Sequence, residues 1–404
     1  MIFLQEQAEI LIERIITVLL TSSLSPSTIT RLRTEFPEIT HDDFREAIDI
    51  AGGTLHARQS GKFSDTFSDW LFTKQTFEQS TSDIIAKHHA SRFSSAHSVL
   101  EICTGSGIDT TAFSAAGKTI TTIEANHTIA LLAKRNFKHN RVQSATLLEG
   151  IAENILIPDF DFKSYDGLWA DPSRRQADGK RMSTRGDEYE PDLEWIMSIP
   201  IEGVSGIKIS PALTMEHLPD GWVREWIGYK SECREQILWR NVDFEDGLVT
   251  LVDKQISWQP TAKNSISPLD IIHHLDTAQF LVEPHSCLIR CGYLAEFYHN
   301  LGIGLFDHRI GYGIASRMPD VSSFLSVFEV IEYFPFNYKH LQKRISELNW
   351  NKETEIKKRG FPELPDEVRK KLRFALSDKK GVIILSQKEK QKLVFLAKRI
   401  RYNQ

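Results

Sequence analysis

Long apolar runs are missing from this sequence. No stretch reaches the roughly 18 uncharged apolar residues that a membrane-spanning helix needs. The apolar residues between positions 1 and 20 are interrupted by Glu6, Glu9 and Glu13, and their spacing is that of one helix face rather than of a signal peptide. We therefore expect a cytoplasmic protein without a membrane partner.

Cysteine is also scarce, because the chain has four and no two of them form a Cys-x-x-Cys pair. This pattern argues against a disulfide framework and against a zinc ribbon. Cys287 and Cys291 are four residues apart without a partner cluster, so we predict two buried thiols and no metal site.

Charge is unevenly distributed along the chain. The net charge of −5 combines a basic tail with an acidic body. Residues 335–404 contain 19 Lys and Arg against 8 Asp and Glu, or +11, whereas residues 1–334 contain 30 against 46, or −16. Such a division indicates a tail that faces a polyanion such as nucleic acid. The alternative is a solvated, Lys-rich helical surface.

The first 58 or so residues have helical patterns. One helix starts near Ser25-Pro26-Ser27, because proline is favoured in the first helical turn. A second helix is predicted to be capped at His41-Asp42-Asp43 and to end at Gly52-Gly53.

Strand and helix patterns alternate from about residue 80, which is typical of a doubly wound α/β sheet. The alternation weakens from about residue 262. We therefore predict a helical lobe, an α/β core, an α+β domain and a small basic α+β domain, at residues 1–75, 76–261, 262–334 and 335–404.

A glycine-containing turn lies at residues 99–109, where Val-Leu-Glu-Ile-Cys-Thr-Gly-Ser-Gly-Ile-Asp leads from a strand into a helix. Gly105 and Gly107 let the backbone approach a ligand without a Cβ clash. Glu124 ends the next predicted strand, where a carboxylate chelates two ribose hydroxyls. The combination predicts a nucleoside cofactor. The alternative is a tight turn beside a surface glutamate.

Three features favour a sulfonium cofactor over a nicotinamide dinucleotide. A dinucleotide fingerprint has a third small residue three places after the second glycine, and Thr110 occupies that position here. Glu101 and Asp109 add negative charge, which a pyrophosphate avoids and a sulfonium tolerates. The third feature is the motif after the fourth strand. A nicotinamide oxidoreductase is kept as a minor alternative.

That motif is Asp171-Pro172-Ser173-Arg174-Arg175. Because ligands of open α/β sheets lie beyond the carboxyl ends of the strands, Asp171 is expected beside the same crevice as Gly105. The motif resembles the Asp/Asn-Pro-Pro-aromatic motif of class I methyltransferases that modify exocyclic amino groups.

In that chemistry a carboxylate and a backbone carbonyl accept the hydrogens of the amine, and in-line positioning supplies most of the acceleration. Here Ser173 replaces the second proline and Arg174 replaces the aromatic residue. A guanidinium stacks on a base or binds a phosphate, and both roles stay open for Arg174. The predicted catalytic residues are Asp171, Pro172, Arg174 and Arg175. The alternative is a helix-capping Asp beside two surface arginines.

Together with the tail, these motifs resemble the bacterial class I methyltransferases that carry a C-terminal THUMP-like domain, distant relatives of trimethylguanosine synthase. The resemblance covers most of the chain. It includes segments before the first strand, after the fourth and fifth strands, at the start of a ferredoxin-like insert and in the tail: 77–81, 189–192, 208–211, 280–284, 356–360, 364–365 and 368–372.

The resemblance implies an α/β fold with a Rossmann-like class I methyltransferase sheet, an N-terminal helical lobe, a ferredoxin-like α+β insert and a small basic C-terminal domain. Cys103 stands where the family has a glycine, and Ile151-Ala152-Glu153 where Asp-Ala-Glu is typical. Adenine contacts are therefore expected from the Ala152 backbone or from Glu153. The other implied contacts to the cofactor, S-adenosylmethionine, are Glu101, Thr104, Gly105, Gly107, Asp109 and Glu124.

The leading hypothesis is S-adenosylmethionine-dependent methyl transfer to a base amine of RNA. The alternative is a non-catalytic RNA-binding protein with a degenerate Rossmann-like core. Protein and small-molecule acceptors and the oligomeric state stay open. The tail supplies the predicted RNA-binding residues Lys357, Lys358, Arg359, Arg369, Lys370, Lys371 and Arg373.

Overall fold

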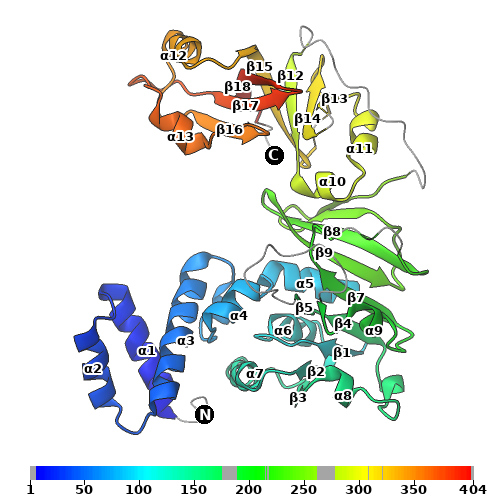
Figure 1. Ribbon diagram of the computed structural model, residues 1–404. Coiled ribbons are helices and arrows are strands. Elements are labelled where there is room, and N and C mark those ends of the chain that lie inside the picture. The colour runs from blue at the N-terminus through cyan, green and yellow to red at the C-terminus, as the bar shows by residue number, and fades with distance from the viewer. Residues whose placement is uncertain are drawn as a thin grey trace. The chain divides into compact units, whose positions relative to one another are not determined.

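The computed structural model describes residues 6–174, 189–213, 215, 218–261, 278–307, 309–320 and 322–401. The chain divides into two units (Figure 1). The first unit comprises Met1–Glu225 and Glu235–Glu245, and the second comprises Trp226–Arg234 and Asp246–Gln404. The chain passes between the units within two strands, β8 (Trp222–Tyr229) and β9 (Glu232–Arg240).

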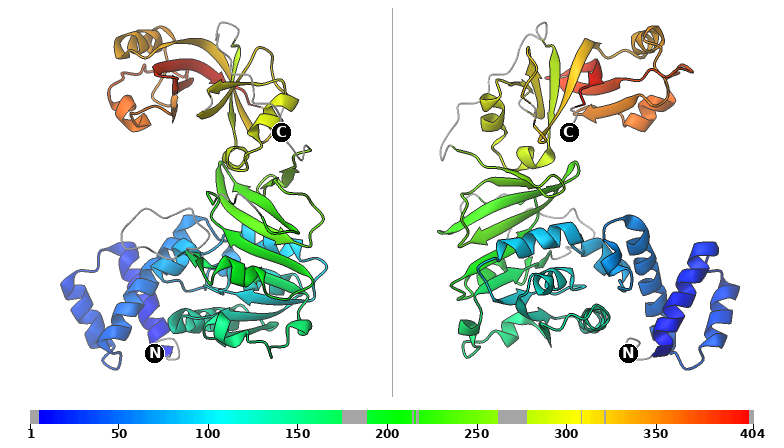
Figure 2. Two further views of the ribbon diagram at one scale, coloured as in Figure 1. Left: turned by 45° about the vertical axis from the view of Figure 1, so that its right-hand side comes forward. Right: turned by 180° about the vertical axis from the view of Figure 1, so that it is seen from behind.

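The first unit begins with three helices that lie side by side (Figure 2). They are α1 (Glu6–Thr21), α2 (Pro26–Glu35) and α3 (His41–Ser60), and their apolar faces share one buried cluster. Helix α2 starts at the predicted proline, and the Ser25 side chain caps it. The short helices α4 (Lys74–Gln79) and α5 (Asp83–Arg92) follow.

The predicted course of α3 was wrong at both ends. The Thr40 side chain caps the helix, ahead of His41-Asp42-Asp43. The helix continues past Gly52-Gly53 to Ser60, and Gly61 ends it with a φ of 62°. Gly53 serves packing instead, because a Cβ at this position would lie 2.4 Å from the carbonyl oxygen of Phe72.

A mainly parallel sheet forms the centre of the first unit. Six neighbouring strands of a nine-stranded sheet follow the order β3-β2-β1-β4-β7-β9, in which the first five are parallel and β9 is antiparallel to β7. Strand β1 has a neighbour on each side, β2 and β4, so the strand order reverses there as in doubly wound folds. The strands are β1 (Ser98–Ile102), β2 (Thr119–Glu124), β3 (Ala145–Glu149), β4 (Gly167–Ala170) and β7 (Val204–Ile209).

Helices connect these strands as the sequence pattern predicted. The predicted α/β fold with a Rossmann-like sheet is confirmed. Strands β5 (Ser173–Arg174) and β6 (Tyr189–Glu190) pair in a two-stranded antiparallel sheet. The connecting helices are α6 (Ile108–Ala115), α7 (His127–His139), α8 (Ala152–Ile155) and α9 (Leu193–Met197).

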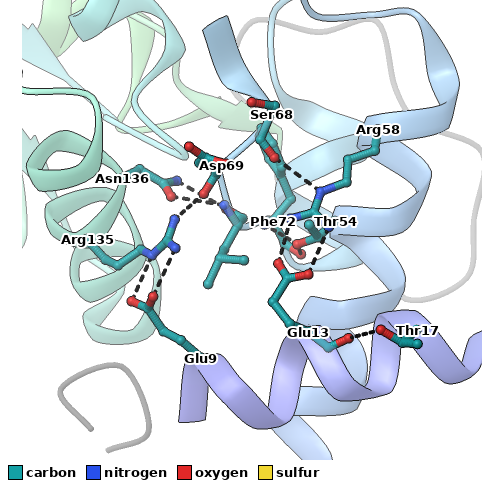
Figure 3. Close-up of polar contacts among 11 residues, drawn as sticks. Glu9, Glu13, Thr17, Thr54, Arg58, Ser68, Asp69, Phe72, Arg135 and Asn136 are labelled. Carbon is teal, nitrogen blue, oxygen red and sulfur yellow. Dashed lines mark hydrogen bonds and ion pairs between the residues drawn. The ribbon is translucent and has the colours of Figure 1, made fainter. Parts of the chain in front are cut away.

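Polar contacts attach the N-terminal helices to the α/β core (Figure 3). Arg135 of α7 makes ion pairs of 3.0 and 3.2 Å with the Glu9 carboxylate of α1. The buried Asn136 side chain accepts from the Leu71 backbone N–H at 3.0 Å and donates to the Leu71 carbonyl at 3.1 Å. Asn136 thereby satisfies both backbone groups of a residue that no strand pairs.

The second unit is built on a seven-stranded sheet in the order β13-β14-β12-β15-β18-β17-β16. Two helices, α12 (Tyr338–Glu347) and α13 (Pro365–Lys370), pack with the face of β17 and β18 that carries Ile383, Leu385, Val394 and Leu396. The strands are β12 (Phe280–Pro284), β13 (Gly304–Asp307), β14 (Ile310–Ala315), β15 (Leu325–Pro335), β16 (Glu355–Arg359), β17 (Val382–Lys388) and β18 (Gln391–Arg399).

The remaining elements of this unit are two short helices and a strand pair, α10 (Ser286–Arg290), α11 (Leu294–Asn300), β10 (Leu248–Leu251) and β11 (Ile256–Trp258). Cys287 and Cys291 are buried. The predicted boundary between residues 334 and 335 falls at the end of β15, and strands on both sides of it belong to one sheet. The four-part division of the chain stays a prediction. Over the described ranges, no helix has the length and apolar character needed to span a bilayer.

We expect Asn136→Ala to destabilise the first unit by roughly 2–4 kcal/mol, because it leaves the buried N–H and C=O of Leu71 unsatisfied. Glu13→Ala is the control. Glu13 pairs with Arg58, but its side chain is 54% exposed, so its loss should cost less than about 1 kcal/mol. Calorimetric unfolding of both variants measures the difference, and equal shifts would refute the role of Asn136.

Candidate functional site

The turn after β1 is left-handed at three positions. Cys103, Gly105 and Gly107 have φ values of 68°, 56° and 90°. Left-handed backbone costs residues with a Cβ roughly 1–2 kcal/mol, and Cys103 carries this cost at a position where the resemblance predicts glycine. The predicted glycine turn is thus present, with one non-glycine residue held in a glycine conformation.

The two glycines serve different purposes. A Cβ at Gly105 would meet no atom within 4 Å, whereas a Cβ at Gly107 would lie 2.3 Å from the Phe137 ring. Gly107 therefore permits α7 to pack against the start of α6. The space at Gly105 is open, as a backbone that contacts a ligand requires.

Glu124, the last residue of β2, contacts this turn directly. One carboxylate oxygen accepts the Gly105 backbone N–H at 3.0 Å, and the other accepts the Asn126 N–H at 2.9 Å. Burial raises the pKa of Glu124. The structure therefore brings together the turn and the acid that the sequence predicted as partners.

Two other predicted cofactor residues, Glu101 and Thr104, are buried within this segment. The Thr110 hydroxyl donates to Glu101 at 2.5 Å, and Thr104 shares a 2.6 Å hydrogen bond with Thr122. Burial raises the pKa of Glu101 to about 8. At neutral pH Glu101 is therefore largely protonated.

Asp109, on the first turn of α6, belongs to a buried ion-pair network. Its carboxylate lies 2.8 Å from Nδ1 of His89, and Nε2 of His89 lies 3.0 Å from Glu235 of β9. Although burial opposes protonation, Asp109 and Glu235 raise the pKa of His89 to about 9. His89 is thus a buried cation between two carboxylates.

Asp171 follows β4 and faces Lys208 of β7. The Lys208 ammonium donates to Oδ2 of Asp171 at 2.8 Å and to the Thr81 hydroxyl at 3.0 Å, and it lies 3.5 Å from Glu235. Burial raises the pKa of Asp171, while Lys208 opposes this rise. Burial also disfavours the charge on Lys208, but Asp171, Glu235 and Asp109 raise its pKa well above the usual range.

Sequence reasoning missed His89, Lys208 and Glu235 as site residues. Lys208 had a visible signal, because it is the one charged residue of the strand Val-Ser-Gly-Ile-Lys-Ile and lies in a segment of the family resemblance. His89 and Glu235 had none, since each acquires its partners through tertiary contacts.

The segment before β1 also reaches the site. Ser80 shares a 2.5 Å hydrogen bond with Ser106 of the glycine turn, and the neighbouring Thr81 accepts from Lys208. The resemblance included this segment, and its hydroxyls now connect the glycine turn with the Asp171–Lys208 ion pair.

Cys103 lies among the predicted carboxylates. Burial raises the pKa of its thiol, and Glu124, Asp171, Glu153 and Glu101 raise it further. Four acidic residues from four segments therefore act on one position. Ala152 is buried and Glu153 is exposed at the start of α8.

The remaining predicted catalytic residues differ in placement. Pro172 is buried. Arg174 is exposed on β5, opposite Tyr189 of β6. Arg175 lies outside the described residues.

Four of the seven predicted RNA-binding residues make internal contacts. Lys357 pairs with Glu283 at 2.8 Å, and Arg359 lies over the Tyr312 ring at 5.2 Å. Arg369 donates to two backbone carbonyls, and Lys371 pairs with Glu363 at 2.7 Å. In the described part of the chain, no salt bridge involves the other three, Lys358, Lys370 and Arg373.

Comparisons with known proteins support the family resemblance. A family model described as THUMP domain-like matches residues 325–399. An uncharacterized S-adenosylmethionine-dependent methyltransferase of Mycobacterium tuberculosis, from strains CDC 1551 and H37Rv, is 24% identical over 353 residues, which are 82% of this chain and 90% of the relative. A crystal structure from Porphyromonas gingivalis W83, provisionally described as a methyltransferase, has a TM-score of 0.68 and 17% identity, covering 92% of this chain and 98% of that one.

The chain has the class I methyltransferase fold and a C-terminal THUMP-like domain. The match at 325–399 begins with β15 and ends with β18. The more distant relation to trimethylguanosine synthase stays a prediction.

We expect Gly105→Ala and Gly107→Ala to differ in stability. Both place a Cβ at positive φ, at roughly 1–2 kcal/mol, but only the Gly107 variant also clashes with Phe137, which adds about 1–3 kcal/mol. Gly107→Ala should therefore melt at a clearly lower temperature in calorimetry. Equal melting temperatures would contradict the packing role of Gly107.

Stability should fall as pH rises from about 5 to 9. Glu101 and His89 have folded pKa values of about 8 and about 9, both above the unfolded values, so the folded state holds more protons in this window. The His89 contribution is full below its unfolded pKa and is lost as pH passes about 9. The melting temperature of Glu101→Gln should fall less steeply with rising pH than that of the wild type. If the melting temperatures of the two proteins fall equally between pH 5.5, 7 and 8.5, the pKa of Glu101 is not raised.

Proposed function

We propose that this protein is an S-adenosylmethionine-dependent methyltransferase that acts on a base amine of RNA. The observation that carries the proposal is that the glycine turn, Glu124 and Asp171 meet at neighbouring strand ends. Glu124 accepts the Gly105 N–H, and the Asp171 N–H donates to the Ile102 carbonyl at the end of β1. These elements leave the carboxyl ends of β1, β2 and β4, where open α/β sheets bind their ligands.

The residues present fit this cofactor. Gly105 leaves room beside the backbone, and Glu124 provides a carboxylate at the position that suits ribose hydroxyls. When bound, S-adenosylmethionine supplies an electrophilic methyl group on a positively charged sulfur. The ion-pair network has three carboxylates, Asp109, Asp171 and Glu235, against the two cations Lys208 and His89. An excess of negative charge favours a cationic ligand.

Asp171 is suited to receive an amine. Lys208 holds Oδ2, while Oδ1 makes no hydrogen bond within the described residues, and the side chain is 28% exposed. An aromatic amine is planar and a poor nucleophile, so an acceptor for its N–H at a fixed position helps to direct its lone pair. Asp171 accepts that hydrogen, and Pro172 fixes the turn that presents the neighbouring backbone carbonyl.

RNA as the acceptor is supported by the second unit. The THUMP-like domain at 325–399 occupies most of the segment that carries a net charge of +11, and basic segregation of this kind suits a polyanion. Arg174 is exposed on β5, three residues after Asp171, and would orient the acceptor by stacking or by a phosphate contact. A cytoplasmic location stays part of the proposal.

A non-catalytic RNA-binding protein is the second candidate. The observation in its favour is Cys103, which occupies a left-handed position of the cofactor turn at a φ of 68°. Such a protein would bind RNA without forming a methylated product.

The test combines cofactor binding with methyl transfer. By calorimetry, wild type should bind S-adenosylmethionine at micromolar concentrations, and Glu124→Ala should bind at least about tenfold more weakly, since it loses a hydrogen bond to a charged group of about 1.5–3 kcal/mol. Asp171→Ala should lower cofactor affinity less than Glu124→Ala does, but lose roughly 10²-fold or more of labelled methyl transfer to cellular RNA.

Glu202→Ala is the control, because Glu202 is an exposed acid between α9 and β7 and both activities should persist in it. Millimolar binding in wild type would refute the cofactor assignment. Binding without any transfer to RNA would favour the non-catalytic candidate, and transfer that survives Asp171→Ala would remove Asp171 from the reaction.

A further inference from the structure

Strands β8 and β9 each carry one buried glutamate that contacts a histidine of α5. Glu225 of β8 lies 2.9 Å from Nε2 of His88. Glu235 of β9 lies 3.0 Å from Nε2 of the next residue, His89. Burial raises the pKa of both glutamates, but their cationic partners outweigh this effect and lower each pKa to about 2. Two ion pairs of the same kind therefore join neighbouring positions of α5 to these strands.

The partners of Glu225 are structural. Besides His88, its carboxylate accepts from the Arg92 guanidinium at 2.6 Å and from the Trp239 indole N–H at 3.0 Å. These side chains come from α5 and from β9. The contacts of Glu225 therefore fasten the helix to the two strands.

Glu235 also contacts the candidate site. Its Oε1 lies 3.5 Å from the Lys208 ammonium, which donates to Oδ2 of Asp171 at 2.8 Å. A lysine side chain is flexible and its ammonium has three N–H groups, so a single carboxylate would not fix its position. Asp171, Glu235 and the Thr81 hydroxyl surround it with three oxygen-bearing neighbours. Glu235 thus determines where the charge that holds Asp171 lies.

His89 holds Glu235 in turn. The imidazole is fully buried, and its Nδ1 lies 2.8 Å from Asp109 of α6. Its ring packs on the Trp169 ring of β4, with the centroids 4.4 Å apart. Trp169 lies two positions before Asp171 on the same segment. Contacts with α6, β4 and β9 therefore give the Glu235 carboxylate a cation in a fixed position.

We propose that Glu235 and His89 are positioning residues for methyl transfer. His89 holds the Glu235 carboxylate, which holds the Lys208 ammonium. That ammonium keeps Asp171 in the orientation that presents Oδ1 to the acceptor amine. The inference rests on the proposed function, in which Asp171 receives the amine, and it adds the residues that orient this carboxylate from behind.

The first experiment uses Glu235→Gln, which keeps the shape of the side chain and removes its charge. Lys208 then loses one of its two carboxylate neighbours, and its movement displaces Asp171. Because a misplacement of about 1 Å costs about 10²-fold in rate, kcat for labelled methyl transfer to cellular RNA should fall roughly 10²-fold. The KM for S-adenosylmethionine should rise less than it does in Glu124→Ala.

Glu225→Gln is the matched control, because it removes the same charge from a buried glutamate that pairs with the neighbouring histidine. Both variants should lower the melting temperature to a similar extent, since each removes one partner of a buried ion pair. Only Glu235→Gln should lose methyl transfer, whereas the control should keep nearly the wild-type kcat. Equal losses of kcat in the two variants would overturn the proposal, because they would reflect a general loss of structure.

A conservative variant tests whether the charge of Glu235 matters. Glu235→Asp keeps the carboxylate on a side chain one methylene shorter. Its kcat should be at least about fivefold higher than that of Glu235→Gln, because the attraction between unit charges falls only gradually with distance. If Glu235→Asp is as slow as Glu235→Gln, the carboxylate charge is not what positions Lys208 and the proposal is wrong.

The role of His89 is tested by combining two substitutions. His89→Gln should lower kcat, whereas His88→Gln, at the neighbouring position of α5, should not. The double variant His89→Gln/Glu235→Gln removes a cation and an anion together, and its kcat should be no lower than that of the slower single variant, because both residues act along one path. Additive losses would show that His89 acts independently and would remove it from the proposal.

Crystal structures of wild type, Glu235→Gln and Glu225→Gln test the geometry without an acceptor. The Asp171 carboxylate should shift by about 1 Å in Glu235→Gln, as the expected loss of rate requires, and should keep its place in the control. An unmoved Asp171 carboxylate in Glu235→Gln would overturn the inference.

Two further outcomes separate this inference from the proposed function. If wild type binds S-adenosylmethionine but methylates no RNA, the RNA acceptor falls, and the crystal structures decide whether Glu235 positions Asp171. If wild type methylates RNA and Glu235→Gln does so at the same rate, the proposed function stands and only this inference falls.

Discussion

The rest of the site depends on one buried charge, the Lys208 ammonium. It contacts Asp171 after β4, Thr81 before α5 and Glu235 on β9. An unpaired ion in a protein interior costs several kcal/mol, so these segments are constrained to meet around it. Removing any one partner would leave the others poorly compensated. The ion pair thus fixes Asp171 at the end of the sheet while one of its oxygens stays open.

The glycine turn is held by a second set of contacts. Glu124 accepts two backbone N–H groups, Ser80 bonds to Ser106, and Phe137 packs against Gly107. These contacts compensate the left-handed Cys103. A departure from the family pattern at one residue is therefore compatible with an intact turn, because the surrounding packing determines its conformation.

Local patterns predicted the sheet and the meeting of the glycine turn, Glu124 and Asp171 at the carboxyl ends of its strands, since these residues are readable along the chain. The predicted end of α3 was wrong because Gly53 resembles a helix stop in the sequence. In the fold, glycine is required there because the Phe72 carbonyl leaves no room for a Cβ. His89 and Glu235 are 146 positions apart, and no local sequence pattern predicts that they pair. Long-range pairing of charges was the part of the site that periodicity and motif spacing could not supply.

The same limit applies to the basic tail. Its net charge of +11 is a property of the whole segment. Lys357, however, pairs with Glu283, 74 positions away, so its charge stabilises the fold and is less available to bind a phosphate. Charge available for binding is what remains after internal pairing. Burial and pairing therefore divide one basic segment into cations that hold the sheet together and cations that face solvent, and only the second group is able to exchange counterions for a polyanion.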